Sequence, residues 1–424
     1  MPVPSEITAV ILAGGIGKRF TPFTTDKTLF PFMGKSLLWR TLKMVEQSGI
    51  RRVVVATNSY NHDWVESSKG EFSLEITTHR QESPQGMADA LLALESVLPD
   101  RDIVVMNSGD MVEPHLLPEL LQRTEGNEVV LTGMVTPTYQ PLGYFVLEGE
   151  RVVAVQEKPG ADNMPSDVAN LVFHYFSQPG AFLQLLRSVS DNSNDDAYEQ
   201  ALSQLMQTTS VGLYRYTGRW QKLKFGHNVL DMVQFLLTDI PGSISGSATI
   251  ADTARIHGNV VIEDGAKVFD GATIVGPCYI GKNVIVGNNA LVRESIVEEN
   301  AVIGFGSEVA RSYVGISSDL HHAYVGDSVL EKMVHFGYGA HTANLRFDKR
   351  PIKVKDLQNE QQTDKVKLGA LVAESAELGV NVSLLPGVTI GHHSLVFPGL
   401  VVADSIQDNS IARYQKLEIE IQER

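Results

Sequence analysis

Residues 11–32 read ILAGGIGKRFTPFTTDKTLFPF, and this stretch decides how the amino-terminal half of the chain folds. The apolar run Thr8–Leu12 has the length of a buried strand, and glycines at positions 14, 15 and 17 then interrupt it. Glycines without a Cβ let backbone N–H groups approach a phosphate closely, and positive side chains follow at Lys18, Arg19 and Lys27. The stretch therefore predicts a buried strand followed by a polyphosphate-binding loop.

Spacing excludes two common phosphate-binding motifs. A dinucleotide fingerprint needs a third glycine where this chain has Phe20, and a Walker A loop ending at Ser36 needs glycine at Leu29. The stretch instead resembles the signature of the sugar-1-phosphate nucleotidylyltransferases, L-A-G-G-x-G-T-R-L-x-P-L-T followed by P-K-P-L-x-P. Lys18 and Asp26 stand where that family has threonine and proline. The matching positions are Leu12, Ala13, Gly14, Gly15, Gly17, Arg19, Pro22, Thr24, Lys27 and Pro31.

The resemblance implies roles for these residues. Leu12, Ala13, Gly14 and Gly15 would bind a nucleoside triphosphate, and Arg19 and Lys27 would act in catalysis by neutralising charge on its phosphates. Residues 81–91, QESPQGMADAL, resemble the family segment whose glutamine and glycine contact a pyrimidine base. The resemblance assigns that role to Gln81 and Gly86. Without the resemblance, the loop that follows Leu12 would be interpreted as an ordinary glycine-rich turn, and residues 81–91 as the start of a helix.

A carboxylate follows the apolar strand Ile103–Met106 at Asp110. Magnesium takes one or two carboxylates plus substrate phosphates, and nucleotidyl transfer needs such a cation beside the triphosphate. The family places its magnesium ligand at this Gly-Asp position, so Asp110 is the candidate ligand for Mg²⁺. An aspartate in an ordinary turn is the alternative interpretation.

Residues 143–159, GYFVLEGERVVAVQEKP, predict a hairpin of two strands. The segment resembles the family motif in which Gly143, Glu157 and Lys158 contact the sugar and its phosphate, and Asn170 resembles the asparagine that also touches the sugar. Trp220 matches the family's W-x-D, but Lys222 stands at the aspartate that normally helps to hold the metal.

Strand-like and helix-like segments alternate through residues 1–240, with helices expected at 36–47 and 88–97 and strands at 52–57 and 103–106. This alternation predicts parallel βαβ units with ligands at the carboxyl ends of the strands. We therefore expect an α/β fold, a Rossmann-like nucleotidylyltransferase domain, over residues 1–240.

From Ile244 the chain changes character, because an aliphatic residue recurs every six positions, from Ile250 as far as Val292. A hexapeptide repeat means short strands joined by tight turns, so residues 241–405 predict a parallel β-solenoid. The resemblance to hexapeptide-repeat acyltransferases implies the left-handed form, a left-handed parallel β-helix. Residues 348–364 have lost the repeat and predict a loop insertion, and residues 406–424, which end in LEIEIQER, predict a carboxy-terminal cap or tail.

Residues 320–327, LHHAYVGD, and 337–346, GYGAHTANLR, resemble the acetyltransferase half of bifunctional enzymes that join N-acetylglucosamine-1-phosphate uridylyltransferase to glucosamine-1-phosphate acetyltransferase, in their archaeal form. The resemblance implies His321 as the catalytic base, since imidazole accepts a proton near neutral pH. It further implies an acetyl-transfer site that includes Tyr324, Tyr338 and Asn344, with acetyl-CoA as co-substrate. Surface histidines on an inert scaffold are the alternative.

Composition limits the remaining function classes. The net charge of −15 argues against wholesale binding of nucleic acid, and no apolar run reaches the roughly eighteen residues of a membrane span. A single cysteine, Cys278, excludes an intrachain disulfide framework. The amino terminus lacks a basic region ahead of its apolar stretch, so we expect a cytoplasmic protein, and the solenoid resemblance implies a homotrimer.

The sequence thus predicts a sugar-1-phosphate nucleotidylyltransferase that forms a UDP- or dTDP-sugar and pyrophosphate from a nucleoside triphosphate and a sugar-1-phosphate. A second, acetyl-CoA-dependent N-acetyltransferase activity on an amino-sugar-1-phosphate is expected from the solenoid. Two alternatives stay open at this point: a solenoid that only oligomerises the enzyme, and a weakly catalytic nucleotide-sugar sensor, which Lys18, Lys222 and Tyr338 motivate because they depart from the family pattern.

Overall fold

The computed structural model describes residues 3–98, 101–190, 196–355 and 360–415, and its chain forms two compact units. The first unit contains residues 1–17, 26–30 and 36–221, and the second contains residues 18–25, 31–35 and 222–424. The chain therefore passes between the units five times. Among the described helices, none combines the length and the apolar character that crossing a bilayer requires.

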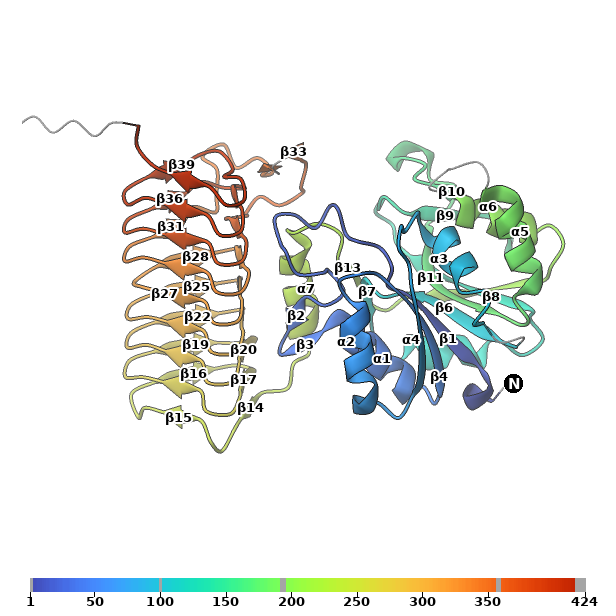
Figure 1. The fold of residues 1–424 in the computed structure, drawn as a ribbon, viewed down its shortest axis with the longest axis horizontal. Helices are drawn as coiled ribbons and strands as arrows, with labels where there is room; N and C mark the ends of the chain where they lie inside the picture. Colours follow the sequence, from blue (N-terminus) through green and yellow to red (C-terminus); the bar gives the residue numbers. More distant parts are fainter. Residues whose placement is uncertain (1–2, 99–100, 191–195, 356–359, 416–424) are drawn as a thin grey trace, which may run out of the picture. The chain divides into compact units, whose positions relative to one another are not determined.

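The first unit is built on a nine-stranded sheet (Figure 1). Its central path runs β10-β9-β11-β6-β1-β4-β5, and β8 joins β11 to β12. The strands are β1 (Thr8–Leu12), β4 (Arg52–Thr57), β5 (Glu75–Arg80), β6 (Ile103–Asn107), β8 (Val129–Val135), β9 (Gly143–Glu148), β10 (Arg151–Glu157), β11 (Val168–Phe176) and β12 (Val211–Tyr216).

The sheet is mixed, whereas the alternation of segments predicted parallel units. Strands β1, β4, β5 and β6 are parallel, as expected, but β11 runs antiparallel to β6, β8 and β9. The hairpin predicted over residues 143–158 is present as β9 and β10, which turn at Gly149 with φ 63°. A turn this short joins only antiparallel strands, because a parallel connection needs a crossover of a dozen residues or more.

Helices cover both faces of the sheet. Helices α1 (Leu37–Gln47), α2 (His62–Ser68) and α4 (Leu116–Gln122) share one core with the sheet, and α3 (Met87–Ala93), α5 (Gly180–Ser190) and α6 (Ala197–Leu205) share the other. Strand β1 is wholly buried because its residues alternate between the two cores: Ala9 and Ile11 enter the first, Val10 and Leu12 the second.

The helix predicted over 36–47 is confirmed, and the Ser36 hydroxyl caps it by accepting a hydrogen bond from Trp39 N at 3.1 Å. The helix predicted over 88–97 is α3, which ends at Ala93 and continues as turns. The remaining short elements of the first half are the 3₁₀ turns η1 (Pro4–Glu6), η2 (Lys69–Glu71) and η3 (Ala161–Asn163), the strand pair β2 (Pro31–Phe32) and β3 (Lys35–Ser36), and β7 (Asp110–Val112), which pairs with β13 (Trp220–Lys222).

In the second unit, helix α7 (Asn228–Leu237) precedes a solenoid whose coils each add one short strand to each of three parallel sheets (Figure 1). The first face holds β14 (Ser243–Ile244), β17 (Val260–Ile262), β20 (Cys278–Ile280), β23 (Ile296–Val297), β26 (Tyr313–Val314), β29 (Val329–Leu330), β34 (Leu371–Val372) and β37 (Thr389–Ile390). The second holds β15 (Thr249–Ile250), β18 (Lys267–Val268), β21 (Ile285–Val286), β24 (Val302–Ile303), β27 (Asp319–Leu320), β30 (His335–Phe336), β35 (Glu377–Leu378), β38 (Leu395–Val396) and β40 (Ile411–Ala412). The third holds β16 (Arg255–His257), β19 (Thr273–Val275), β22 (Leu291–Arg293), β25 (Glu308–Ala310), β28 (Tyr324–Gly326), β31 (His341–Thr342), β36 (Ser383–Leu384) and β39 (Val401–Val402).

The hexapeptide pattern explains this architecture. After Val292 the spacing shortens once to five residues, at Val297, and the six-residue period then resumes at Ile303 and Val309. These three residues and the repeat residues from Ile262 to Val292 fill one continuous core. Each is at most 1% exposed. One inward aliphatic residue per face stacks on its equivalent in the next coil, so the β-helix of hexapeptide repeats predicted from the sequence is confirmed.

Between β31 and β34 the chain leaves the coil, and β32 (Val354–Lys355) pairs antiparallel with β33 (Glu360–Gln361) inside the stretch predicted as an insertion. After β39, residues 403–415 add a last partial turn in which β40 pairs with β38. The segment LEIEIQER, expected to belong to a cap, lies outside the described residues.

Candidate functional site

The carboxyl ends of β1 and β6 lie side by side in the first unit. Leu12 pairs with Asn107, and the Ser108 hydroxyl donates a hydrogen bond to Leu12 O at 3.0 Å. Asp110 follows at the start of β7, and its Oδ2 accepts a hydrogen bond from Asn107 Nδ2 at 3.2 Å. The register of two parallel strands thus places the Asp110 turn against the strand that leads into the glycine loop.

Two buried asparagines brace the glycine loop. Asn61 Nδ2 donates a hydrogen bond to Ala13 O at 2.8 Å, and Asn58 Nδ2 lies 3.3 Å from Gly15 O. Both side chains have 0% exposure. These two asparagines were not predicted from the sequence. They follow the carboxyl end of β4, which neighbours β1 in the sheet, and this position could have indicated that they lie beside the glycine loop.

Asp26, which replaces the family's proline, ties the lysine segment to this brace. Its Oδ1 accepts hydrogen bonds from Thr28 N at 2.8 Å and from the Thr28 hydroxyl at 2.6 Å, and its Oδ2 accepts one from Asn58 Nδ2 at 3.0 Å. Lys27 lies between these two residues and is half-buried. The departure from the family signature therefore supplies a side chain that holds Lys27 in the same network as the glycine loop.

Gln81 packs over Gly14. Its Nε2 donates a hydrogen bond to Asp89 Oδ2 at 2.9 Å, which fixes the orientation of the carboxamide. A Cβ added at Gly14 would stand 1.8 Å from Gln81 Oε1, so any larger residue there would displace the Gln81 carboxamide. Within the described part of the chain this buried Oε1 has no hydrogen-bond partner. Gly86, at φ 115°, precedes the first residue of α3 in the same loop.

A second cluster gathers where β9, β10 and β11 meet. Gly143 pairs with Glu157, and a Cβ at Gly143 would lie 3.1 Å from Glu157 Oε2 and 3.6 Å from Asn170 Cβ. Lys158 Nζ forms an ion pair with Glu157 Oε1 at 2.7 Å, and Lys158 holds a left-handed backbone, φ 44°. The structure therefore brings together the four residues expected to contact the sugar phosphate.

Behind this cluster, a buried chain of side chains orients Asn170. His174 Nε2 lies 2.9 Å from Asn170 Oδ1, and His174 Nδ1 lies 3.0 Å from the Tyr198 hydroxyl. Burial lowers the pKa of His174 to about 3, so the ring is neutral and donates only one of these two hydrogen bonds. When His174 Nε2 is the donor, Asn170 Oδ1 is the acceptor, and the NH₂ group of Asn170 remains to donate hydrogen bonds elsewhere. Sequence reasoning missed His174, although residues four apart in a strand share a face.

Three other cationic side chains of the sequence signature belong to the second unit. Lys18 and Arg19 are exposed in the segment 18–25, and Lys222 is half-buried at the end of β13. Only Lys18 separates Arg19 from Gly17, the last glycine of the loop.

In the solenoid, two of the expected acetyl-transfer residues are in contact. Asn344 Nδ2 donates hydrogen bonds to the Tyr324 hydroxyl at 3.1 Å and to Asp327 Oδ2 at 2.5 Å. Arg311 forms a two-pronged ion pair with Asp327, with both N–O distances at 2.7 Å. Asp327 and Arg311 were not predicted; Asp327 directly follows the Tyr324 strand β28, and Arg311 follows β25, which pairs with β28 from the adjacent coil.

His321 follows β27 and is 56% exposed. Its Nε2 lies 3.1 Å from Asp319 Oδ2, which also lies 2.7 Å from His335 Nδ1. Tyr338 stacks on His322 with ring centroids 5.0 Å apart, and both residues are exposed, so the two rings pack on each other at the surface.

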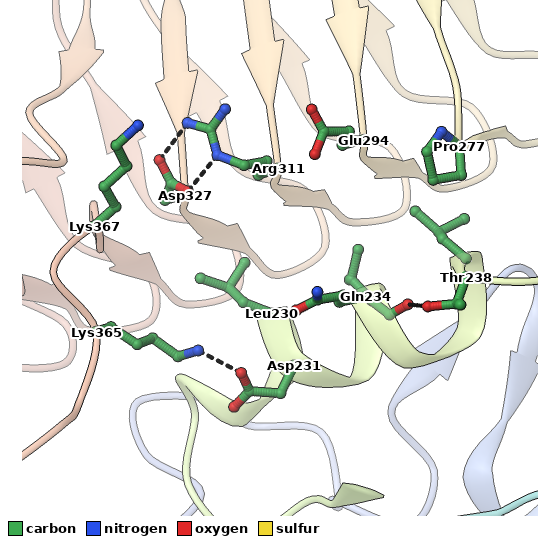
Figure 2. A pocket seen from close by; sticks show the side chains of 12 residues that line it. Leu230, Asp231, Gln234, Thr238, Pro277, Glu294, Arg311, Asp327, Lys365 and Lys367 are labelled. Carbon is green, nitrogen blue, oxygen red and sulfur yellow. Dashed lines mark hydrogen bonds and ion pairs between the residues drawn. The ribbon is translucent and has the colours of Figure 1, made fainter. Parts of the chain in front are cut away.

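A pocket of about 310 Å³ lies beside Asp327, between α7 and the solenoid coils of the same unit (Figure 2). Lys365 reaches Asp231 across it, and Arg311 and Asp327 stand on its opposite wall. Lys367 lines it too, and forms no ion pair with another residue that the structure describes. The pocket therefore carries two ion pairs, with the Lys367 ammonium and the Glu294 carboxylate as further charges.

Comparison with known proteins places this geometry in a family. Residues 8–221 match the family model described as nucleotidyl transferase, which spans half of the chain. The chain belongs to the nucleotidyl transferase family. Residues 259–294 match six repeats of the bacterial transferase hexapeptide, in agreement with the solenoid coils.

Two bifunctional relatives match this family member over nearly its whole length, and a third relative matches about three quarters of it. The bifunctional sugar-1-phosphate nucleotidylyltransferase/acetyltransferase of Sulfurisphaera tokodaii is 29% identical over 93% of this chain and 96% of its own. The bifunctional protein GlmU of Methanococcus maripaludis is also 29% identical, over 97% of this chain and 98% of its own. The glucose-1-phosphate thymidylyltransferase of Streptomyces antibioticus is 27% identical over 74% of this chain and 94% of its own.

Proposed function

We propose that this chain is a bifunctional enzyme: a sugar-1-phosphate nucleotidylyltransferase in its amino-terminal part, up to about residue 240, and an amino-sugar-1-phosphate N-acetyltransferase in its solenoid. The observation that carries the first activity is the strand register that sets Asp110 against the end of β1, where the glycine loop begins. Ligands of α/β sheets bind at such carboxyl edges.

For the nucleotide, Gln81 supplies the base-recognition group. Its Oε1 is buried, oriented by Asp89 and available as an acceptor above Gly14. Uracil and thymine carry an N3–H and guanine an N1–H that donate to such an acceptor, whereas cytosine and adenine have no ring N–H at that edge; the resemblance of residues 81–91 to a pyrimidine-contacting segment favours the first two. The proposal is therefore a uridine or thymidine triphosphate.

Asp110 fits a magnesium ion, since one carboxylate plus substrate phosphates is a common magnesium environment. When bound there, the ion would stabilise negative charge on the phosphates. The side chains do the remaining work: Asn58, Asn61 and Asp26 hold the loop and Lys27 in place, and Arg19 and Lys27 neutralise phosphate charge.

In the reaction, a phosphate oxygen of the sugar-1-phosphate attacks the α-phosphorus of the triphosphate. A new P–O bond forms, and the bond from the α-phosphorus to the bridging oxygen breaks, so that pyrophosphate leaves with the electron pair. Glu157 and Asn170 would hold the sugar hydroxyls and Lys158 its phosphate, with Gly143 leaving the room that the sugar requires.

For acetyl transfer, Asp319 orients the base. If the Asp319 carboxylate accepts the Nε2 proton of His321, Nδ1 is left to take a proton from the sugar amine as it attacks the thioester carbonyl. The C–S bond breaks, and the proton passes to the departing thiolate of CoA. Tyr324 and Asn344 are proposed to bind the sugar, and a backbone N–H near Tyr338 to bind the oxyanion. We also propose that the chain forms a homotrimer and that it acts in the cytoplasm.

Two assays test the two activities. Pyrophosphate release is measured with UTP or dTTP, Mg²⁺ and a panel of sugar-1-phosphates, and no turnover with any pair would favour the sensor alternative. Thiol release from acetyl-CoA with glucosamine-1-phosphate is measured for the wild type and His321→Ala. Release by the wild type that His321→Ala abolishes supports the second activity, and no release by the wild type would leave the solenoid as a scaffold.

A further inference from the structure

The second face of the solenoid gathers an aspartate and two histidines by its register. Asp319 in β27 pairs with His335 in β30, on the adjacent coil. Their neighbours Leu320 and Phe336 are 0% exposed and point into the core. Because side chains alternate along a strand, Asp319, His335 and His321, which is two residues beyond Asp319, are all directed outward.

These three side chains converge on one point. Asp319 Oδ2 lies 2.7 Å from His335 Nδ1 and 3.1 Å from His321 Nε2. The three ligand-type atoms all lie within 4.8 Å of one another, and the two imidazole rings have centroids 5.3 Å apart. Among the described residues this is the one group of three or more such side chains with a metal-binding arrangement.

We propose that Asp319, His321 and His335 bind a divalent transition-metal ion, for which Zn²⁺ is the probe. Ligands of tetrahedral zinc at about 2.0–2.1 Å stand roughly 3.3 Å apart, a spacing that small side-chain rotations from the present separations would reach. Two imidazoles and one carboxylate suit zinc, whereas magnesium and calcium prefer oxygen ligands. Three protein ligands leave the fourth position of the ion to water.

Metal binding has a consequence for the solenoid activity, and this consequence rests on the proposed acetyltransferase. An ion on His321 Nε2 and Asp319 would occupy both the carboxylate and the ring nitrogen through which Asp319 orients the imidazole, so the base would lose its positioning contact. Zinc would therefore inhibit acetyl transfer reversibly, and the amino-terminal reaction would be unaffected by this site.

The binding test uses the full chain freed of metal by a chelator, titrated calorimetrically with Zn²⁺. The wild type should bind one more Zn²⁺ per chain than Asp319→Asn or His335→Ala. Losing even an outer-shell partner typically costs about 10–100-fold in zinc affinity, so losing a direct ligand should weaken this site at least about tenfold. His341→Ala is the matched control, since His341 is exposed on the third face and bonds Gly339 O and Ser383 instead.

The proposed zinc site would be refuted if the wild type, Asp319→Asn and His335→Ala bound zinc equally. It would also be refuted if only His341→Ala lost zinc binding. Inhibition is then measured as the zinc concentration that halves thiol release, which His335→Ala should raise at least about tenfold. The two failures are distinguishable, because zinc binding is measured without substrates: a wild type without acetyltransferase activity would remove only the inhibitory consequence.

Discussion

The Glu331 carboxylate accepts two hydrogen bonds from Thr25, one from the backbone N–H at 2.9 Å and one from the hydroxyl at 2.7 Å. It also accepts the backbone N–H of Thr24 at 3.2 Å, and it is only 2% exposed. Glu298, two coils earlier on the same face, holds Met33 N at 2.6 Å and Gly34 N at 2.9 Å. Buried solenoid carboxylates thus anchor both segments of the amino-terminal sequence that belong to the second unit.

Glu331→Ala should impair nucleotidyl transfer. The segment 18–25 carries Arg19, and its part-buried backbone donors would lose their acceptor, at a cost of less than the roughly 1–3 kcal/mol of a fully buried donor left unsatisfied. We expect a lower kcat for pyrophosphate release, because Arg19 would be less well positioned, and a lower unfolding temperature. Glu263→Ala is the matched control, since Glu263 directly follows β17 as Glu331 follows β29. Equal effects of the two substitutions on kcat would contradict the anchoring role.

Gly14→Ala and Gln81→Ala should show strong coupling in a double-mutant cycle. The new Cβ conflicts only with Gln81 side-chain atoms, the nearest at 1.8 Å, so the substitution should destabilise the wild type and cost much less in the Gln81→Ala background. Contacting residues typically couple by about 0.5–3 kcal/mol, which chemical denaturation of the four proteins measures. Additive effects would show that Gln81 does not pack over the glycine loop.

Asn170→Asp should raise the KM for the sugar-1-phosphate. Aspartate keeps an oxygen for His174 but replaces the NH₂ donor that the proposed sugar contact requires. Loss of one hydrogen bond worth about 0.5–1.5 kcal/mol predicts a rise of roughly two- to tenfold, with the KM for the nucleotide nearly unchanged. Steady-state kinetics with each substrate varied in turn checks this. A change confined to the nucleotide KM would place Asn170 elsewhere in the mechanism.

His174 should make the first unit less stable in acid. Burial lowers its pKa to about 3, against an ordinary value of 6.5, so between these pH values the unfolded chain binds a proton that the native chain does not. Its contribution is fully present above pH 6.5 and falls by up to about 1.4 kcal/mol per pH unit on acidification. His174→Gln should therefore reduce the slope of unfolding free energy against pH between 6 and 4. Tyr198→Phe, which leaves the ring buried, should retain it; identical slopes in all three proteins would refute this assignment.

The sequence predicted those features of the fold that depend on local patterns of residues. The bounds of β1 and β4, the turn of the β9–β10 hairpin and the solenoid core all follow from apolar runs, glycines and the hexapeptide period. Residues that act through strand register or distant packing were missed, among them Asn58, His174 and Glu331. Asp26 shows the reason most clearly. In the sequence it is only a departure from the family signature, where proline is usual. The fold shows that its carboxylate accepts hydrogen bonds from Thr28 and Asn58.

Transfer of label from α-³²P-labelled UTP or dTTP to a sugar-1-phosphate tests the central claim most directly. The wild type should form labelled nucleotide-sugar only when both Mg²⁺ and the sugar-1-phosphate are present, and Asp110→Asn should lower the rate by at least about a hundredfold, as expected when an electrostatic contribution of roughly 3 kcal/mol is removed. Labelled product formed equally well by Asp110→Asn, or no product from the wild type with any sugar-1-phosphate, would contradict the account.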